Sequence, residues 1–230
     1  MSDEPLKTVV LNDRHVAAGG RMVPFSGYAL PVQYPSGIMA EHKWTREHAG
    51  LFDVSHMGPG FLTLNDPSGD AEADHAAVAA LVEPLISGDI AGLKPGSIRY
   101  TLLLNQAGGT IDDLMVGRSP LFAGALYIVV NAGTKEGDFA ILEAAAGDKA
   151  RLVRADGGNA LLALQGPEAA SVISSIAPGA ADLGFMHYAP FDWGGERLIV
   201  SRAGYTGEDG FEILVSAANA PKLWDQLLAD

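Results

Sequence analysis

The strongest constraint on the fold is a pair of apolar segments joined by a short polar turn. They read IRYTLLL at residues 98–104 and TIDDLMVGR at residues 110–118, with NQAGG between them. Runs of this composition around a Gly-containing turn are typical of a β-hairpin. The pattern therefore predicts two neighbouring antiparallel strands.

Both halves of the chain show the same alternation of strands, glycine turns and helices. Helices are predicted over residues 39–50, with Gly50 as C-cap, and over residues 68–82, with Ser68 or Asp70 as N-cap. Strands interrupted at Gly58–Gly60 are expected between them. Hairpins without a GxGxxG βαβ unit favour an α+β fold with antiparallel sheets.

Two adjacent carboxylates, Asp112 and Asp113, lie inside the second strand of the predicted hairpin. Aspartate is depleted in strands, and neighbouring strand residues point to opposite faces. One carboxylate should therefore face inward while the other faces outward. The pattern does not decide which, and a solvated turn that holds both is the plainer alternative.

A second unusual segment, GYTGEDGFEI at residues 204–213, combines three glycines with Tyr205 and Glu212. It could be a hairpin turn with solvated acids. However, Glu212 alternates with Phe211 and Ile213, so it points to the face opposite those apolar side chains. If that face is covered, Glu212 is a buried carboxylate that needs hydrogen-bond donors, such as the amine and N–H groups of a pterin ring.

Two further residues are candidates for a pocket, although each has a plain structural role. Tyr100 has apolar neighbours and could be an ordinary core residue, and Asn131 follows a buried strand, where it could form a turn or cap. Together these residues indicate a pocket of carboxylates and aromatic side chains, but they do not identify its ligand.

The sequence argues against two other kinds of site. Asp53, Ser55 and His56 are close in sequence, but a catalytic triad converges from distant segments and no GxSxG motif is present. A local hydrogen bond between Asp53 and His56 is the better interpretation. The histidines show no HExxH or comparable ligand spacing, so no metal site is expected.

Composition limits the partners and the compartment. The chain has 230 residues, no cysteine and a net charge of −13, so catalytic thiols are excluded and nucleic-acid binding is disfavoured. No apolar run reaches the roughly 18 residues that span a bilayer. We expect a cytoplasmic protein that binds neither nucleic acid nor a membrane.

Six co-linear segments together resemble the aminomethyltransferase family, the T-protein of the glycine cleavage system. They read GGRMVPFSGYALPVQYPSG, HAGLFDVSHMG, YTLLLNQAGGTIDDLMV, YIVVNAGTKEGD, NALLALQGPEAA and SRAGYTGEDGFEI. The resemblance runs from about residue 7 to the end of the sequence.

The resemblance implies a folate-binding aminomethyltransferase fold over residues 1–230, with two intimately packed units at approximately 1–147 and 148–230. The family continues into an Arg-containing motif and a C-terminal β-barrel domain, and both are absent from this sequence. We therefore expect a truncated form that is weakly active or inactive.

The resemblance also implies a reaction and the residues that serve it. The family takes the one-carbon unit from the aminomethyl-lipoyl arm of H-protein, releases ammonia, and gives 5,10-methylenetetrahydrofolate from the co-substrate tetrahydrofolate. Asp113 matches the catalytic position. Tyr100, Asn131, Tyr205 and Glu212 match positions of the folate pocket, with Glu212 at the pterin edge.

Two alternatives share these motifs. One is a folate-dependent demethylase that acts on a free methylated amine or sulfonium compound. The other is a non-catalytic folate-binding module, a class that generally lacks the acid of the DDL motif. The chain keeps that acid as Asp113, which favours the transferase.

Overall fold

The computed structural model describes residues 5–229 and divides them into two compact units. Unit 1 contains the described residues up to 56 together with 158–185 and from 190 onward, and unit 2 contains residues 57–157 and 186–189. The expected boundary near residue 147 is thereby corrected. Distant segments join in unit 1, since strand β4 (Gly50–Asp53) hydrogen-bonds to β10 (Asn159–Gln165) rather than to its neighbour in sequence.

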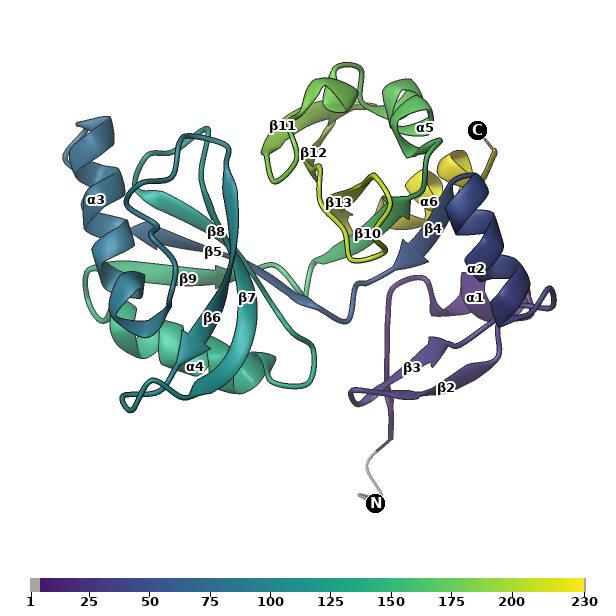
Figure 1. Ribbon diagram of the computed structural model, residues 1–230, viewed down its shortest axis with the longest axis horizontal. Coiled ribbons are helices and arrows are strands. Elements are labelled where there is room, and N and C mark those ends of the chain that lie inside the picture. The colour runs from purple at the N-terminus through teal and green to yellow at the C-terminus, as the bar shows by residue number, and fades with distance from the viewer. Residues whose placement is uncertain (1–4, 230) are drawn as a thin grey trace. The chain divides into compact units, whose positions relative to one another are not determined.

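Unit 2 is built on one antiparallel five-stranded sheet in the order β6-β7-β8-β5-β9. Its elements are β5 (Gly58–Leu64), α3 (Ala71–Val82), η1 (Glu83–Leu85), β6 (Ile98–Leu104), β7 (Thr110–Arg118), β8 (Ala125–Val130), α4 (Lys135–Ala146) and β9 (Ala150–Arg154). Figure 1 shows α3 and α4 beside this sheet, and contacts join α3 to β5 and β8, and α4 to β8 and β9.

The hairpin predicted from sequence is β6 and β7. The backbone N–H of Asn105 donates to the Gly109 carbonyl at 2.8 Å, and the Asn105 side-chain oxygen accepts from Ala107 and Gly109. Gly108 has a φ of +79°, which a residue with a side chain rarely adopts. The side chain of Asn105, the first residue of the turn, therefore closes it.

The core of unit 2 lies between its sheet and its two helices. Leu62, Leu103 and Ile128 from the strands pack with Val78 of α3 and Phe139 of α4, and all are at most 1% exposed. Asp70 caps α3, as predicted, by accepting from the N–H groups of Glu72 and Ala73. Burial of this helix-facing side leaves the opposite face of the sheet without a helix from this unit.

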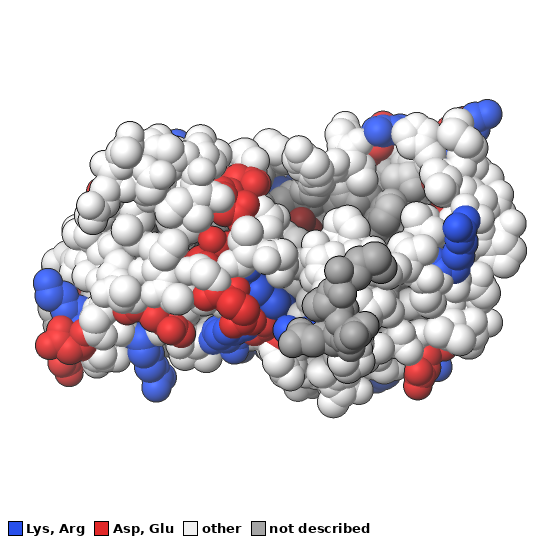
Figure 2. All heavy atoms as spheres, turned by 90° about the horizontal axis from the view of Figure 1, so that it is seen from below, with Lys and Arg blue, Asp and Glu red and all other residues white. Residues whose placement is uncertain are grey.

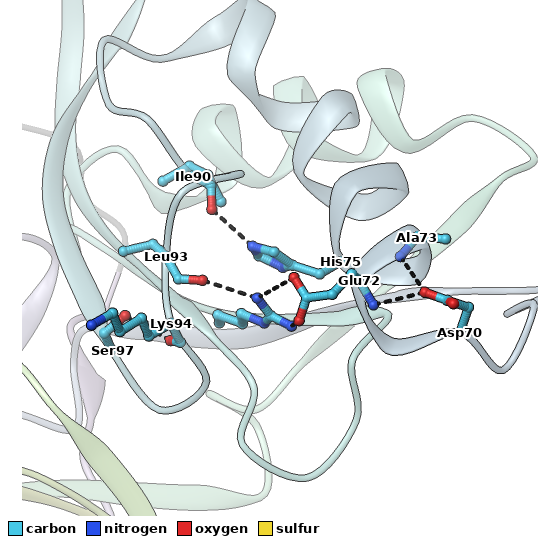
Figure 3. A network of polar contacts seen from close by, with 9 residues as sticks. Asp70, Glu72, Ala73, His75, Ile90, Leu93, Lys94 and Ser97 are labelled. Atoms are coloured by element: carbon cyan, nitrogen blue, oxygen red, sulfur yellow. Dashed lines mark hydrogen bonds and ion pairs between the residues drawn. The ribbon is translucent and has the colours of Figure 1, made fainter.

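A buried arginine, Arg118, ties the loop before β6 to the start of α3, and Figure 3 labels its partners Glu72 and Leu93. The Arg118 guanidinium donates to the Leu93 carbonyl at 3.1 Å and pairs with Glu72 at 2.6 Å. His75 lies beside it and contacts the Ile90 carbonyl at 2.9 Å. The loop therefore gains its order from side chains that lie far apart in sequence.

Unit 1 contains two sheets. The small sheet has the order β1-β3-β2, and its β1–β3 pair is parallel, whereas the strand pairs of the larger sheet whose register is established are antiparallel. The larger sheet has the order β11-β12-β13-β10-β4. The strands are β1 (Lys7–Thr8), β2 (Met22–Phe25), β3 (Tyr28–Pro31), β4 (Gly50–Asp53), β10 (Asn159–Gln165), β11 (Tyr188–Trp193), β12 (Glu196–Ser201) and β13 (Gly210–Ser216).

The helices of unit 1 lie against both of its sheets. They are α1 (Asn12–Ala17), α2 (Ile38–Glu47), α5 (Ala169–Ile176), η2 (Ala180–Asp182) and α6 (Ala220–Ala229). Ile173 of α5 and Leu223 of α6 join Leu162 and Phe211 of the sheet in one buried core. The antiparallel sheets with helices confirm the predicted α+β class.

Two local predictions are wrong. Helix α2 ends at the C-cap His48, and Gly50 instead begins β4, where a Cβ would lie 2.5 Å from the Thr45 hydroxyl. The strands β4 and β5 are separated by residues 54–57, whereas Gly58 and Gly60 lie within β5. There, a Cβ on Gly58 would strike Val130, so these glycines permit close packing rather than a turn.

Candidate functional site

The two adjacent carboxylates of β7 point to opposite faces of the unit 2 sheet. The register pairs Asp112 with the buried Leu103, and Asp113 with Leu102, which is 36% exposed. Asp112 thus lies on the face that carries α3 and α4. Asp113 shares the other face with Tyr100, its diagonal neighbour on β6.

Asn131 holds both carboxylates from the end of β8. Its side-chain N–H₂ group donates to Asp112 Oδ1 at 3.0 Å, to Asp113 Oδ1 at 3.1 Å and to the Asp113 carbonyl at 3.1 Å. These three contacts fix the orientation of the amide and of the Asp113 carboxylate. The residue that could have been a simple turn former therefore belongs to the carboxylate cluster.

Asp112 is stabilised as an anion by neighbours from α4 and its N-cap. Burial opposes its ionisation, but hydrogen bonds from the Thr134 hydroxyl and from Asn131 outweigh this effect and lower the pKa of Asp112. Its role in the structure is therefore to hold the start of α4 against β7.

A third carboxylate, Asp138, lies behind Asp112 in the first turn of α4 and is 1% exposed. Burial, reinforced by the charges of Asp112 and Asp113, raises the pKa of Asp138 to about 6. Within the part of the chain that the structure describes, Asp138 Oδ2 has no hydrogen-bond donor. Sequence reasoning missed this residue, although an acid four positions before the buried Leu142 on a helix was a usable signal.

The cluster contains no cation. Figure 2 shows basic and acidic side chains next to one another on the face drawn. Elsewhere in unit 2, Arg154 pairs with Glu136 at 2.6 Å. None of the ion pairs among residues 5–229 involves Asp112, Asp113 or Asp138. Carboxylates gathered at one end of β7 without an ion pair are costly to the fold and are typical of functional sites.

Tyr100 is 55% exposed and is therefore not the core residue that its apolar neighbours would allow. It stands on β6 opposite Met115, on the same face as Asp113. An exposed phenol beside a fixed carboxylate offers a wall and a hydrogen-bonding group to a ligand.

Glu212 lies on β13 of unit 1, between Ala163 of β10 and Ser201 of β12. The side chain is partly exposed as a whole, but its Oε2 is buried without a hydrogen-bond partner among the described residues. Burial raises the pKa of Glu212 to about 7. The alternation in the sequence therefore predicted a carboxylate, one oxygen of which has no donor among the described residues.

Tyr205 lies in the loop between β12 and β13 and is 99% exposed. It borders a groove of about 950 Å³ in unit 1, which Trp44, Phe52 and Trp224 also line. The other four predicted site residues do not line this groove. Asp113 and Asn131 are thus in contact and share a sheet with Tyr100, whereas Tyr205 and Glu212 belong to unit 1.

The sequence interpretation of Asp53 also needs correction. Asp53 is 2.9 Å from Nε2 of His15, and the other ring nitrogen of His15 is 2.8 Å from the Tyr34 hydroxyl. Both members of the ion pair are 1% exposed. His56 instead packs edge-on against Phe25.

Among the described residues, no group of His, Asp or Glu side chains is arranged to hold a metal ion, and no helix is long and apolar enough to span a bilayer.

Comparison with known proteins extends over nearly the whole chain. The model of the GCVT N-terminal domain matches residues 11–230. The chain belongs to the GCVT N-terminal domain family.

Relatives of this GCVT N-terminal domain are named aminomethyltransferases. The mitochondrial enzyme of Flaveria anomala is 38% identical over 99% of the chain and 54% of its own length. The enzyme of Moorella thermoacetica is 39% identical over 97% of the chain and 58% of its own length. The chain therefore spans a little over half the length of these relatives.

A solved structure shares the fold of the GCVT N-terminal domain. The glycine cleavage system aminomethyltransferase T of Bartonella henselae superposes with a TM-score of 0.83 and 36% sequence identity. The match covers 98% of this chain and 58% of that protein. The fold inferred from the six sequence motifs is therefore confirmed.

Proposed function

We propose that the chain is the folate-binding part of an aminomethyltransferase of the glycine cleavage system. In this proposal it transfers the one-carbon unit from the aminomethyl-lipoyl arm of H-protein to tetrahydrofolate, with release of ammonia and formation of 5,10-methylenetetrahydrofolate. The observation that carries the proposal is the Asp113 carboxylate, fixed by Asn131 and without a cation, on the sheet face that it shares with Tyr100.

Asp113 suits the acid–base part of this chemistry. Asn131 holds one of its oxygens, which leaves the other available to accept or relay a proton from an amine. The negative charge also stabilises a positive charge that develops on a neighbouring nitrogen. Because the carboxylate is oriented before substrate arrives, little reorganisation is needed during the reaction.

Glu212 fits the recognition of tetrahydrofolate. Its buried Oε2 has no donor among the described residues. The amine and N–H groups on one edge of a pterin would supply donors of the kind that this oxygen lacks. We assign Glu212 to the pterin edge, and Tyr100 and Tyr205 to aromatic contacts with the ligand. In unit 2, Asn131 is the proposed residue that orients Asp113.

The remaining parts of the proposal follow the relatives. Lipoylated H-protein is the proposed protein partner, and its lipoyl group carries the aminomethyl unit. The cytoplasm is the proposed compartment, although the Flaveria anomala relative is named mitochondrial.

Two measurements on the 230-residue chain test this function. Calorimetry should show saturable binding of tetrahydrofolate, and loaded H-protein should yield 5,10-methylenetetrahydrofolate, whereas unloaded H-protein should not. The Moorella thermoacetica relative, assayed side by side, calibrates both signals. A chain that binds no tetrahydrofolate under conditions in which the relative does would contradict the proposal.

A further inference from the structure

The loop that carries Tyr205 combines full exposure with an unusually complete set of anchors. Tyr205 itself is 99% exposed, and its two flanking segments are held by side chains from elsewhere in unit 1. An aromatic residue on an ordered backbone binds a ligand at a smaller entropic cost than one on a mobile loop.

The central anchor is Gln165, the last residue of β10, which is 1% exposed. Its Nε2 donates to the Ala203 carbonyl at 3.0 Å, and its Oε1 accepts from the Thr206 hydroxyl at 2.8 Å. Ala203 and Thr206 bracket Tyr205 on its two sides. A single buried carboxamide thus ties down the chain immediately before and after the exposed ring.

Two glycines let the loop approach Gln165. A Cβ on either Gly204 or Gly210 would overlap the Gln165 carboxamide. The glycine spacing that made this segment unusual in sequence is therefore explained by close backbone approach at these two positions. The contact requires glycine at position 204, because a side chain there would displace the loop from Gln165.

Two ion pairs hold the rest of the loop. Arg202 and Asp209 lie at the two ends of the loop and pair through two contacts of 2.9 and 2.6 Å. Arg46 of α2 pairs with Glu208 at 2.8 Å. Since these pairs are partly exposed, the buried Gln165 contacts contribute most of the order near Tyr205.

We propose that Gln165 is a positioning residue that orders the backbone carrying Tyr205, so that its ring is presented to the planar heterocycle of the ligand. This proposal rests on the proposed function for the identity of the ligand as tetrahydrofolate. Gln165 does not touch the ligand; it acts through Ala203 and Thr206. Its loss should weaken binding by leaving Tyr205 free to move.

The first test needs no ligand. Backbone order parameters from ¹⁵N relaxation should show the Tyr205 amide as rigid in the wild-type chain, at about 0.85, and below about 0.6 in Gln165→Met. The matched control is Gln226→Met in α6 of the same unit, which should leave Tyr205 unchanged. Thr206→Val, which removes only one of the two contacts, should give an intermediate value if Gln165→Met does not fold.

The second test is a double-mutant cycle on tetrahydrofolate affinity. Gln165→Met should raise Kd about tenfold, and Tyr205→Ala should raise it at least as much. In the Tyr205→Ala background, Gln165→Met should add less than a twofold change, because both substitutions remove the same interaction.

The two tests separate the proposal from the proposed function. If the wild-type chain does not bind tetrahydrofolate, the proposed function fails, and the order parameters alone decide the role of Gln165. Unchanged order at Tyr205 in both the Gln165→Met and Thr206→Val chains would overturn the proposal. A tenfold effect of Gln165→Met that persists without Tyr205 would also overturn it.

Discussion

The two ends of strand β7 differ in whether their charged side chains form ion pairs. At one end the Arg118 side chain is 5% exposed, pairs with Glu72 and also donates to the Leu93 carbonyl. At the other end, Asp112 faces Asp138 of α4 and Asp113 faces the opposite side, with no ion pair to any of them among the described residues.

This difference separates a structural network from a candidate site. The arginine end satisfies its charge internally and ties a loop to a helix, so its contribution is to stability. The carboxylate end keeps negative charge together at a cost to stability. Residues that lower the stability of the fold without an internal partner are those expected to serve binding or catalysis.

The largest effect on stability should come from the arginine end. Arg118→Met leaves the buried Leu93 carbonyl without its donor and should reduce the free energy of unfolding by up to about 3 kcal/mol, whereas the lost partner of Glu72, which is 80% exposed, adds little. Urea denaturation measures this. Arg151→Met, at an exposed position of β9, is the control and should change little. Equal effects of the two substitutions would remove the structural role given to Arg118.

Substitution at the carboxylate end should instead raise the free energy of unfolding. The pKa of Asp138 is raised from 3.8 to about 6, so its contribution to stability is full below pH 3.8 and is lost as the pH rises through 6. Asp138→Asn should therefore stabilise the chain at pH 8 by about 2 kcal/mol, and much less at pH 4. Urea denaturation at both pH values checks this, with the exposed Asp148→Asn as control. Destabilisation at pH 8 would show that Asp138 has a partner as an anion.

A smaller effect of the same sign is expected at Glu212 in unit 1. The pKa of Glu212 is raised to about 7, so Glu212→Gln should stabilise the chain at pH 8 by about 1 kcal/mol after allowance for its partial exposure. The same substitution should weaken tetrahydrofolate binding. Thermal denaturation and calorimetry measure the two effects, and Glu47→Gln, at an exposed position of α2, should alter neither. A gain in stability without a loss of affinity would rule out the proposed contact between Glu212 and the pterin.

Much of the local structure could be predicted from sequence, because it depends on neighbours in the chain. The turn between β6 and β7 is set by Asn105 and Gly108, and the start of α3 is set by Asp70. The placement of Asp112 and Asp113 on opposite faces follows from strand geometry alone.

Other features could not be predicted because they join distant segments. Asp53 pairs with His15 rather than with the nearby His56, and Gln165 anchors a loop about 40 residues further along the chain. The strands β9 and β10 are adjacent in sequence but belong to different sheets. Tertiary packing decides each of these contacts, and no local pattern records it.

The most direct test of the account is the role of Asp113 in transfer. Asp113→Asn should be compared with wild type for formation of 5,10-methylenetetrahydrofolate from loaded H-protein, with tetrahydrofolate affinity measured in parallel. The same substitution at the aligned position of the Moorella thermoacetica relative provides a full-length reference. The account predicts a fall in rate of at least about 100-fold with affinity within about threefold of wild type. An Asn variant that binds tetrahydrofolate and retains the wild-type rate would contradict it.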